Sequence, residues 1–205
     1  MERLEWLDSS RVGLLCAYNP YVKDYVVLNT SAQVIGEYIG DVFAWSPDRR
    51  MLARVGIYER FGTPAGLNSC LYFNYESVFP QGCDFQDILH NSHVSLKAGT
   101  KGSKPGYTNI HTINGPLAWA PDSEHLAFIL KVFNWQYSDP YSRYLDGVES
   151  AVRYYLAVAS PRGGVLGCSL ATSPGRAEIE WLSSTEVALN GVKYDVQAPS
   201  FAPIE

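Results

Sequence analysis

A tryptophan-centred pattern occurs four times in this 205-residue chain and constrains its fold more than any other feature. In each copy a short alternating stretch ends on tryptophan and a polar turn follows. A second apolar stretch then begins six or seven residues after the tryptophan. This pattern predicts a β-hairpin. The four copies take up four of the five tryptophans and centre on Trp6, Trp45, Trp119 and Trp181.

The turn residues of the repeat suit tight hairpins. Pro47-Asp48 and Pro121-Asp122 preset the first turn residue and supply a carboxylate that caps the local backbone. The first copy uses Asp8-Ser9-Ser10 for the same purpose, and the fourth uses Ser183-Ser184-Thr185. Because a structural role explains Asp48 and Asp122, neither carboxylate is needed for catalysis.

The residues around Trp45 and Trp119 resemble the W-S-P-D-G-x-x-L-A repeat of TolB-like β-propellers, which is related in form to WD-repeat blades. The resemblance covers about eleven residues in each copy. It implies an all-β, β-propeller-like fold. The chain departs from the family pattern where Arg49 and Ser123 replace the glycine after the aspartate, so both turns must close without glycine.

The spacing of the tryptophans predicts a single domain over residues 1–205. The intervals are 39, 74 and 62 residues, and the first matches the roughly 40–45 residues of a four-stranded blade. The longer intervals hold either one blade with insertions or, in the second, a further blade without its tryptophan. We therefore expect about four blades, or five on the latter interpretation. The blade-like units are residues 3–41, 42–116 with insertions, 117–176 with an insertion, and an incomplete last unit over 177–205.

Composition agrees with a folded β-protein. Hydrophobic residues make up 46% of the chain and charged residues 18%, and 14 tyrosines outnumber 2 methionines. A net charge of −5 argues against nucleic acid as the main partner, because a phosphate backbone needs a basic face. No signal-like segment, membrane-length apolar run or cysteine pair motif is present. These absences favour a cytoplasmic protein with reduced cysteines.

The last unit has room for only three strands, and no strand precedes the first hairpin to complete it. Closed propellers leave no exposed sheet edge. Two arrangements remain open: a small ring of about four blades, or an open ring that a partner completes. The sequence does not show whether Met1 is the native start.

Three kinds of chemical site find weak support. Cys83, His90, His93 and His111 lie in one region, yet their spacing fits no zinc signature, so a metal there stays an open question and no cofactor is expected. Serines, histidines and aspartates are present without a G-x-S-x-G elbow. The glycine- and lysine-rich residues 99–104 do not form a phosphate-binding loop motif. We therefore expect no enzyme activity.

An aromatic insertion over residues 134–150 is the strongest candidate for binding. It holds the only tryptophan outside the repeat, and tryptophan, tyrosine and arginine dominate protein interface hot spots. The alternative is that these rings cover the blade's own edge. The predicted partner-binding residues are Trp135, Tyr137, Tyr141, Arg143, Tyr144, Asp146 and, from a similar stretch near the first blade, Tyr21.

Three functions follow from these observations. The first is a non-catalytic protein-binding or scaffolding module that engages a protein partner, in a multi-subunit complex or alone, through aromatic loops. The second is a bacterial immunity or inhibitor protein whose acidic surface neutralises a toxin or enzyme. The third is a hydrolase or sugar-active propeller. Neither the partner's identity nor the oligomeric state can be read from the sequence.

Overall fold

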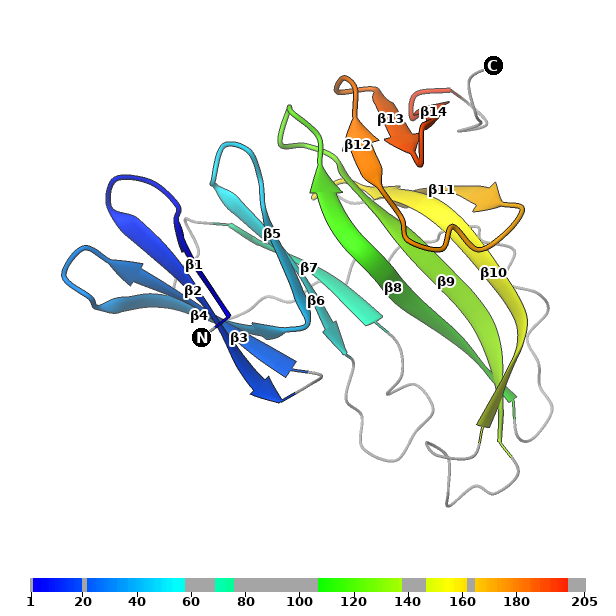
Figure 1. Ribbon diagram of the computed structural model, residues 1–205, viewed down its shortest axis with the longest axis horizontal. Coiled ribbons are helices and arrows are strands. Elements are labelled where there is room, and N and C mark those ends of the chain that lie inside the picture. Colours follow the sequence, from blue (N-terminus) through cyan, green and yellow to red (C-terminus); the bar gives the residue numbers. More distant parts are fainter. Residues whose placement is uncertain are drawn as a thin grey trace.

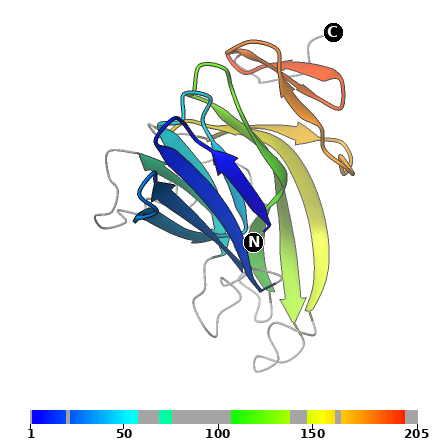
Figure 2. The same cartoon turned by 60° about the vertical axis from the view of Figure 1, so that its left-hand side comes forward.

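The computed structural model describes residues 2–19, 22–57, 69–75, 107–137, 147–161 and 165–198. Every regular element in these ranges is a β-strand, which confirms the prediction of an all-β fold. The strands form four separate antiparallel sheets, called here sheets I to IV in chain order. Figures 1 and 2 show the sheets following one another in a row, with the N-terminus beside sheet I and the C-terminus beside sheet IV.

Each sheet is an up-and-down meander that begins with one of the tryptophan hairpins. Sheet I has the four strands expected in the first interval, namely β1 (Arg3–Trp6), β2 (Arg11–Asn19), β3 (Val22–Asn29) and β4 (Val34–Gly40). Sheet II has three strands in the described residues: β5 (Val42–Trp45), β6 (Met51–Ile57) and β7 (Ser69–Tyr75).

Sheet III is the largest, and its strands are β8 (Tyr107–Trp119), β9 (Leu126–Tyr137), β10 (Gly147–Ala159) and β11 (Val165–Leu170). Sheet IV has the three short strands expected for the last copy: β12 (Ile179–Trp181), β13 (Glu186–Leu189) and β14 (Val192–Asp195). In all four sheets the tryptophan ends the first strand, which is an edge strand.

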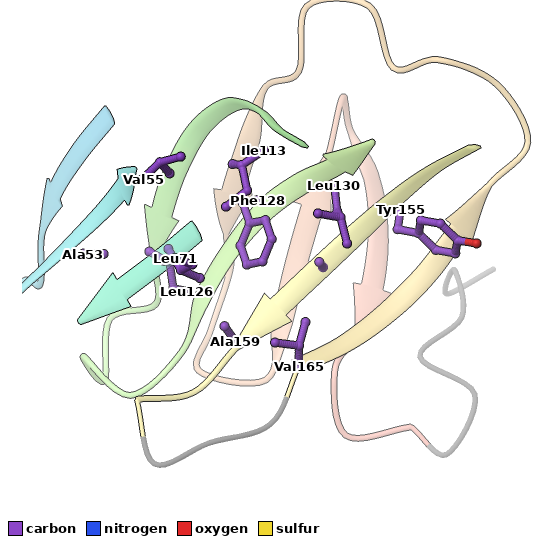
Figure 3. Packing of buried hydrophobic residues seen from close by; sticks show 11 residues of the cluster. Ala53, Val55, Leu71, Ile113, Leu126, Phe128, Leu130, Tyr155, Ala159 and Val165 are labelled. Atoms are coloured by element: carbon purple, nitrogen blue, oxygen red, sulfur yellow. The ribbon is translucent and has the colours of Figure 1, made fainter. Parts of the chain in front are cut away.

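The hydrophobic core lies between consecutive sheets. The largest cluster joins sheets II and III, with Phe128 and Leu71 fully buried at its centre (Figure 3). A second cluster joins sheets III and IV, and a third joins sheets I and II. Because each sheet buries a face against its neighbour, the row is held together by three apolar junctions.

Sheet III extends further than the sequence indicates. We expected residues 134–150 to form an insertion, yet β9 runs to Tyr137 and β10 starts at Gly147, and Asn134 pairs with both Ser150 and Asn109. Polar and aromatic residues alternate over Asn134–Tyr137, which matches the two-residue period of a strand. Both strands therefore extend into the ends of the expected insertion.

The hairpin turns close without glycine by placing another residue in the left-handed region. Arg49 and Ser123 both have a φ of 60°. The preceding aspartates cap the turns: Asp48 Oδ1 accepts the Arg50 N–H at 3.1 Å, and Asp122 Oδ1 accepts the Glu124 N–H at 2.8 Å. The expected structural role of both aspartates is thereby confirmed.

Replacing Arg49 with glycine should stabilise the chain. A left-handed φ costs a side-chain-bearing residue about 1–2 kcal/mol, and the extra freedom of glycine in the unfolded state offsets part of that gain. The exposed Arg49–Glu5 ion pair at 3.8 Å adds little. We expect Arg49→Gly to raise the free energy of unfolding by about 0.5–1 kcal/mol in urea denaturation.

Ser123→Gly is the matched comparison, because Ser123 is buried and its Oγ accepts the Asp48 N–H at 3.2 Å. Its loss cancels the gain, since a hydrogen bond is worth about 1 kcal/mol. Equal stabilisation by both variants would contradict this account of the turns.

Candidate functional site

The tryptophan of each repeat faces the sheet before it. Trp45 and Phe43, two residues earlier, pack into the cluster shared with sheet I. Trp119 and Leu117 pack in the same way against sheet II, as do Trp181 and Ile179 against sheet III. Residues two apart on a strand share a face. The repeat therefore specifies which face of a sheet is buried against its predecessor.

A hydrogen bond from the indole repeats with the same register. Trp119 Nε1 donates to the backbone oxygen of Ala44 at 2.9 Å, and Trp181 Nε1 donates to that of Ala118 at 2.9 Å. Each acceptor lies immediately before the tryptophan of the preceding sheet. The same type of hydrogen bond therefore links sheet III to sheet II and sheet IV to sheet III.

The junction between sheets I and II is a variation on this contact. Trp45 Nε1 donates to the Tyr25 hydroxyl at 2.8 Å, and that hydroxyl donates to Glu5 Oε1 at 2.7 Å. Glu5 lies immediately before Trp6, so the indole reaches the expected residue through an intervening tyrosine. Burial and the Glu5 hydrogen bond raise the pKa of Tyr25, which keeps the hydroxyl protonated as a donor.

On the opposite side of sheet I, the equivalent apolar face is uncovered. Trp6 is 63% exposed, whereas Trp45 is 8% exposed. Leu4, Val34 and Ile39 are 53%, 60% and 60% exposed. By strand register these four residues share one face, with half-buried Val12, Leu14, Val26 and Leu28 between them. Two acidic residues, Asp24 and Glu37, lie on the same face beside Ile39 and Val26. We call Leu4, Trp6, Val34 and Ile39 the docking face.

Sheet IV, at the other end of the row, has a charged outer face where sheet I has an exposed apolar one. On sheet IV the face directed away from sheet III carries Glu178, Glu180, Glu186, Lys193 and Asp195 by strand register. The cation Lys193 is within 4.0 Å of Glu186. A polar outer face is what terminal units of stacked proteins use to stay soluble. Sheet IV is therefore capped with charge, and sheet I is not.

The structure describes only part of the aromatic insertion predicted to bind a partner. The backbones of Trp135 and Tyr137 lie on β9, where Trp135 pairs with Glu149 and Thr108, and so are on a strand and not in a loop. The other predicted residues fall outside the described residues: Tyr21, Tyr141, Arg143, Tyr144 and Asp146.

No metal-binding group is seen within the described ranges, where no three His, Cys, Asp or Glu side chains gather suitably. Cys83, His90 and His93 lie outside those ranges. Cys16 and Cys168 are free thiols. Hydrogen bonds from Ser46 and Arg50 lower the pKa of Asp48 against the opposing effect of burial, so this carboxylate is engaged in its own turn. None of the described segments forms a helix with the length and apolarity to span a membrane.

Sequence reasoning treated Trp6 as one of four equivalent structural residues and missed the docking face. Among the described residues, no sheet precedes sheet I for Trp6 to pack on. The alternation of Val12, Leu14, Val26 and Leu28 on the same face as Trp6 was a signal for the docking face.

Searches against protein-family models, curated proteins and solved structures find no match to this chain, so its sheets and docking face must be interpreted from its own residues.

Proposed function

We propose that this chain is a non-catalytic protein-binding module whose main binding surface is the docking face of sheet I. We further propose that the four sheets are blades of a TolB-like, propeller-type body that presents this face. The observation that carries the proposal is the 63% exposure of Trp6 at a repeat position where Trp45 is buried and Trp119 and Trp181 are partly buried against a neighbouring sheet.

Physical chemistry supports a protein as the occupant. A contiguous apolar face is costly to leave in water, and exposed patches of this kind mark interaction sites. Tryptophan is the residue most enriched among interface hot spots. The docking face is extended and follows the strands of a rigid four-stranded sheet, which suits a protein surface better than a small molecule. The aromatic insertion around Tyr141 is proposed as a second contact.

The test is capture of partners by the tagged full chain in its native host, followed by an affinity measurement with the purified partner. Trp6→Glu places a charge on the docking face and should weaken binding by about 2 kcal/mol or more, which is roughly thirtyfold. Leu182→Glu is the matched control, because Leu182 is 42% exposed on the capped sheet IV. It should bind as the unchanged chain does.

A Trp135→Ala/Tyr141→Ala variant measures the insertion separately. If it weakens binding and Trp6→Glu does not, the binding surface lies on the insertion and the docking-face proposal is wrong. If the chain captures no stoichiometric protein, the binding-module proposal itself fails.

A further inference from the structure

The chain contains three examples of what a tryptophan face packs against, and these define the surface that the docking face requires. On sheet II the surface that takes Trp119 is formed by Val42, Ala44, Ala53 and Phe73, with Ala44 opposite Ala53 and Ala53 opposite Phe73. The ring of Phe73 lies 5.4 Å from that of Trp119. We call these four residues the receiving face.

The receiving face has a consistent centre. The residue before each tryptophan is paired with a small residue on the next strand: Gly13, Ala53, Ala127 and Ala188 in sheets I to IV. In sheets II and III this small residue lies beside the edge carbonyl that accepts the indole N–H. In sheet I the Tyr25 hydroxyl lies over Gly13 and accepts the indole N–H instead. Neither the small residue nor the edge carbonyl depends on which residues occupy the rest of the strand.

We infer that the docking face binds the receiving face of a β-sheet in a partner protein, which continues the row of sheets by one. This inference rests on the proposed function and adds the chemistry of the partner. On its edge strand the partner offers a backbone carbonyl that accepts a hydrogen bond from Trp6 Nε1. A small residue lies beside this carbonyl, and aliphatic and aromatic side chains surround both. No described residue accepts a hydrogen bond from Trp6 Nε1 in this chain.

A second copy of the chain does not offer such a surface. Its other receiving-type faces among the described residues are covered by sheets II, III and IV. Sheet IV retains the small residue Ala188, yet Glu178, Glu180 and Lys193 surround it. Burying Glu178 and Glu180 against the docking face is unfavourable, because the charged residues on that face by register, Asp24 and Glu37, are also acidic. The inferred partner is therefore not a second copy.

The inference can be tested without the natural partner by building a receiving face on sheet IV. Glu178→Val, Glu180→Ala and Lys193→Phe place the residues of Val42, Ala44 and Phe73 at the same positions in the repeat. Trp6→Glu is added so that this receiver variant does not bind itself. It is mixed with the unchanged chain, and complex formation is followed by sedimentation velocity and titration calorimetry.

We expect a one-to-one complex between the unchanged chain and the receiver variant. Trp6→Phe in the donor chain should weaken it about five- to tenfold, because a smaller aromatic ring remains and the N–H donor is lost. Trp6→Glu should abolish it, and a chain carrying Trp6→Glu alone should not act as a receiver. The receiver variant must first melt as a folded protein within a few degrees of the Trp6→Glu chain.

Three outcomes would overturn the inference. The first is no complex with a folded receiver variant. The second is a complex insensitive to Trp6→Phe and Trp6→Glu. The third is self-association of the unchanged chain that Trp6→Glu removes, because the occupant would then be a second copy. If the natural partner still depends on Trp6 in any of these cases, the proposed function stands and only the chemistry of the partner is wrong.

Discussion

Trp45→Ala is expected to lower the free energy of unfolding by about 3–5 kcal/mol, the range for losing a large buried aromatic side chain. Trp45 is 8% exposed and packs between sheets I and II. The substitution also removes the indole N–H that donates to Tyr25 and a cation–π contact with the Arg11 guanidinium at 5.9 Å. Urea denaturation followed by circular dichroism and by tyrosine fluorescence measures the change.

Trp6→Ala is the control, since it removes the same residue type from the same position of the repeat. Trp6 is 63% exposed and covers no neighbouring sheet, so its removal should change the free energy of unfolding by no more than about 0.5 kcal/mol. The contrast tests whether burial depends on the presence of a preceding sheet. Comparable losses in the two variants would show that Trp6 is covered in solution.

Gly13→Ala is expected to destabilise the chain by about 1–3 kcal/mol even though it restores the residue type of the other sheets. Gly13 is buried, and a Cβ atom there would lie 1.9 Å from the Tyr25 hydroxyl oxygen. That hydroxyl is held by both Trp45 and Glu5, so it cannot move without breaking a buried hydrogen bond. Sheets II and III have alanine at this position and carry the smaller Leu71 and Leu156 at the position of Tyr25.

A double variant identifies Tyr25 as the cause. Tyr25 pairs with Leu15 in the register where Leu71 pairs with Val55, so Tyr25→Leu copies sheet II. In the Tyr25→Leu background, Gly13→Ala should become neutral or stabilising, which gives a coupling energy of about 1–3 kcal/mol. Additive effects of the two substitutions, measured by urea denaturation, would contradict the packing described here.

The hairpins could be predicted because the residues that specify each one lie close together in the sequence. Tryptophan at the end of one strand, turn residues such as Pro47-Asp48 and an apolar second strand lie within about eleven residues. The extent of β9 and β10 could not be predicted, because Asn134–Tyr137 reads equally well as a polar aromatic loop until its pairing with Tyr107–Asn109 is known. Strand ends depend on a partner strand that is distant in the chain.

The docking face could not be predicted from the sequence for a related reason. Trp6 has the same local sequence pattern as Trp119, yet Trp119 packs against the preceding sheet and Trp6 contacts no other sheet among the described residues. The hydrogen bond from Trp45 to Tyr25 could not be predicted either, since nothing near Trp45 in the sequence shows that its N–H meets a tyrosine 20 residues earlier. The charged outer face of sheet IV could have been read from Glu178, Glu180 and Lys193 once the strand register was known.

The exchange of the indole protons tests the central claim most directly. In a ¹⁵N-tryptophan-labelled chain, with each signal assigned by a single Trp→Phe variant, the Nε1 protons of Trp45, Trp119 and Trp181 should exchange with D₂O far more slowly than that of Trp6. Each of the three donates across a junction between sheets, and Trp6 does not. Equal protection of Trp6, or exchange of Trp119 and Trp181 as fast as that of Trp6, would contradict the row of sheets and its uncovered end.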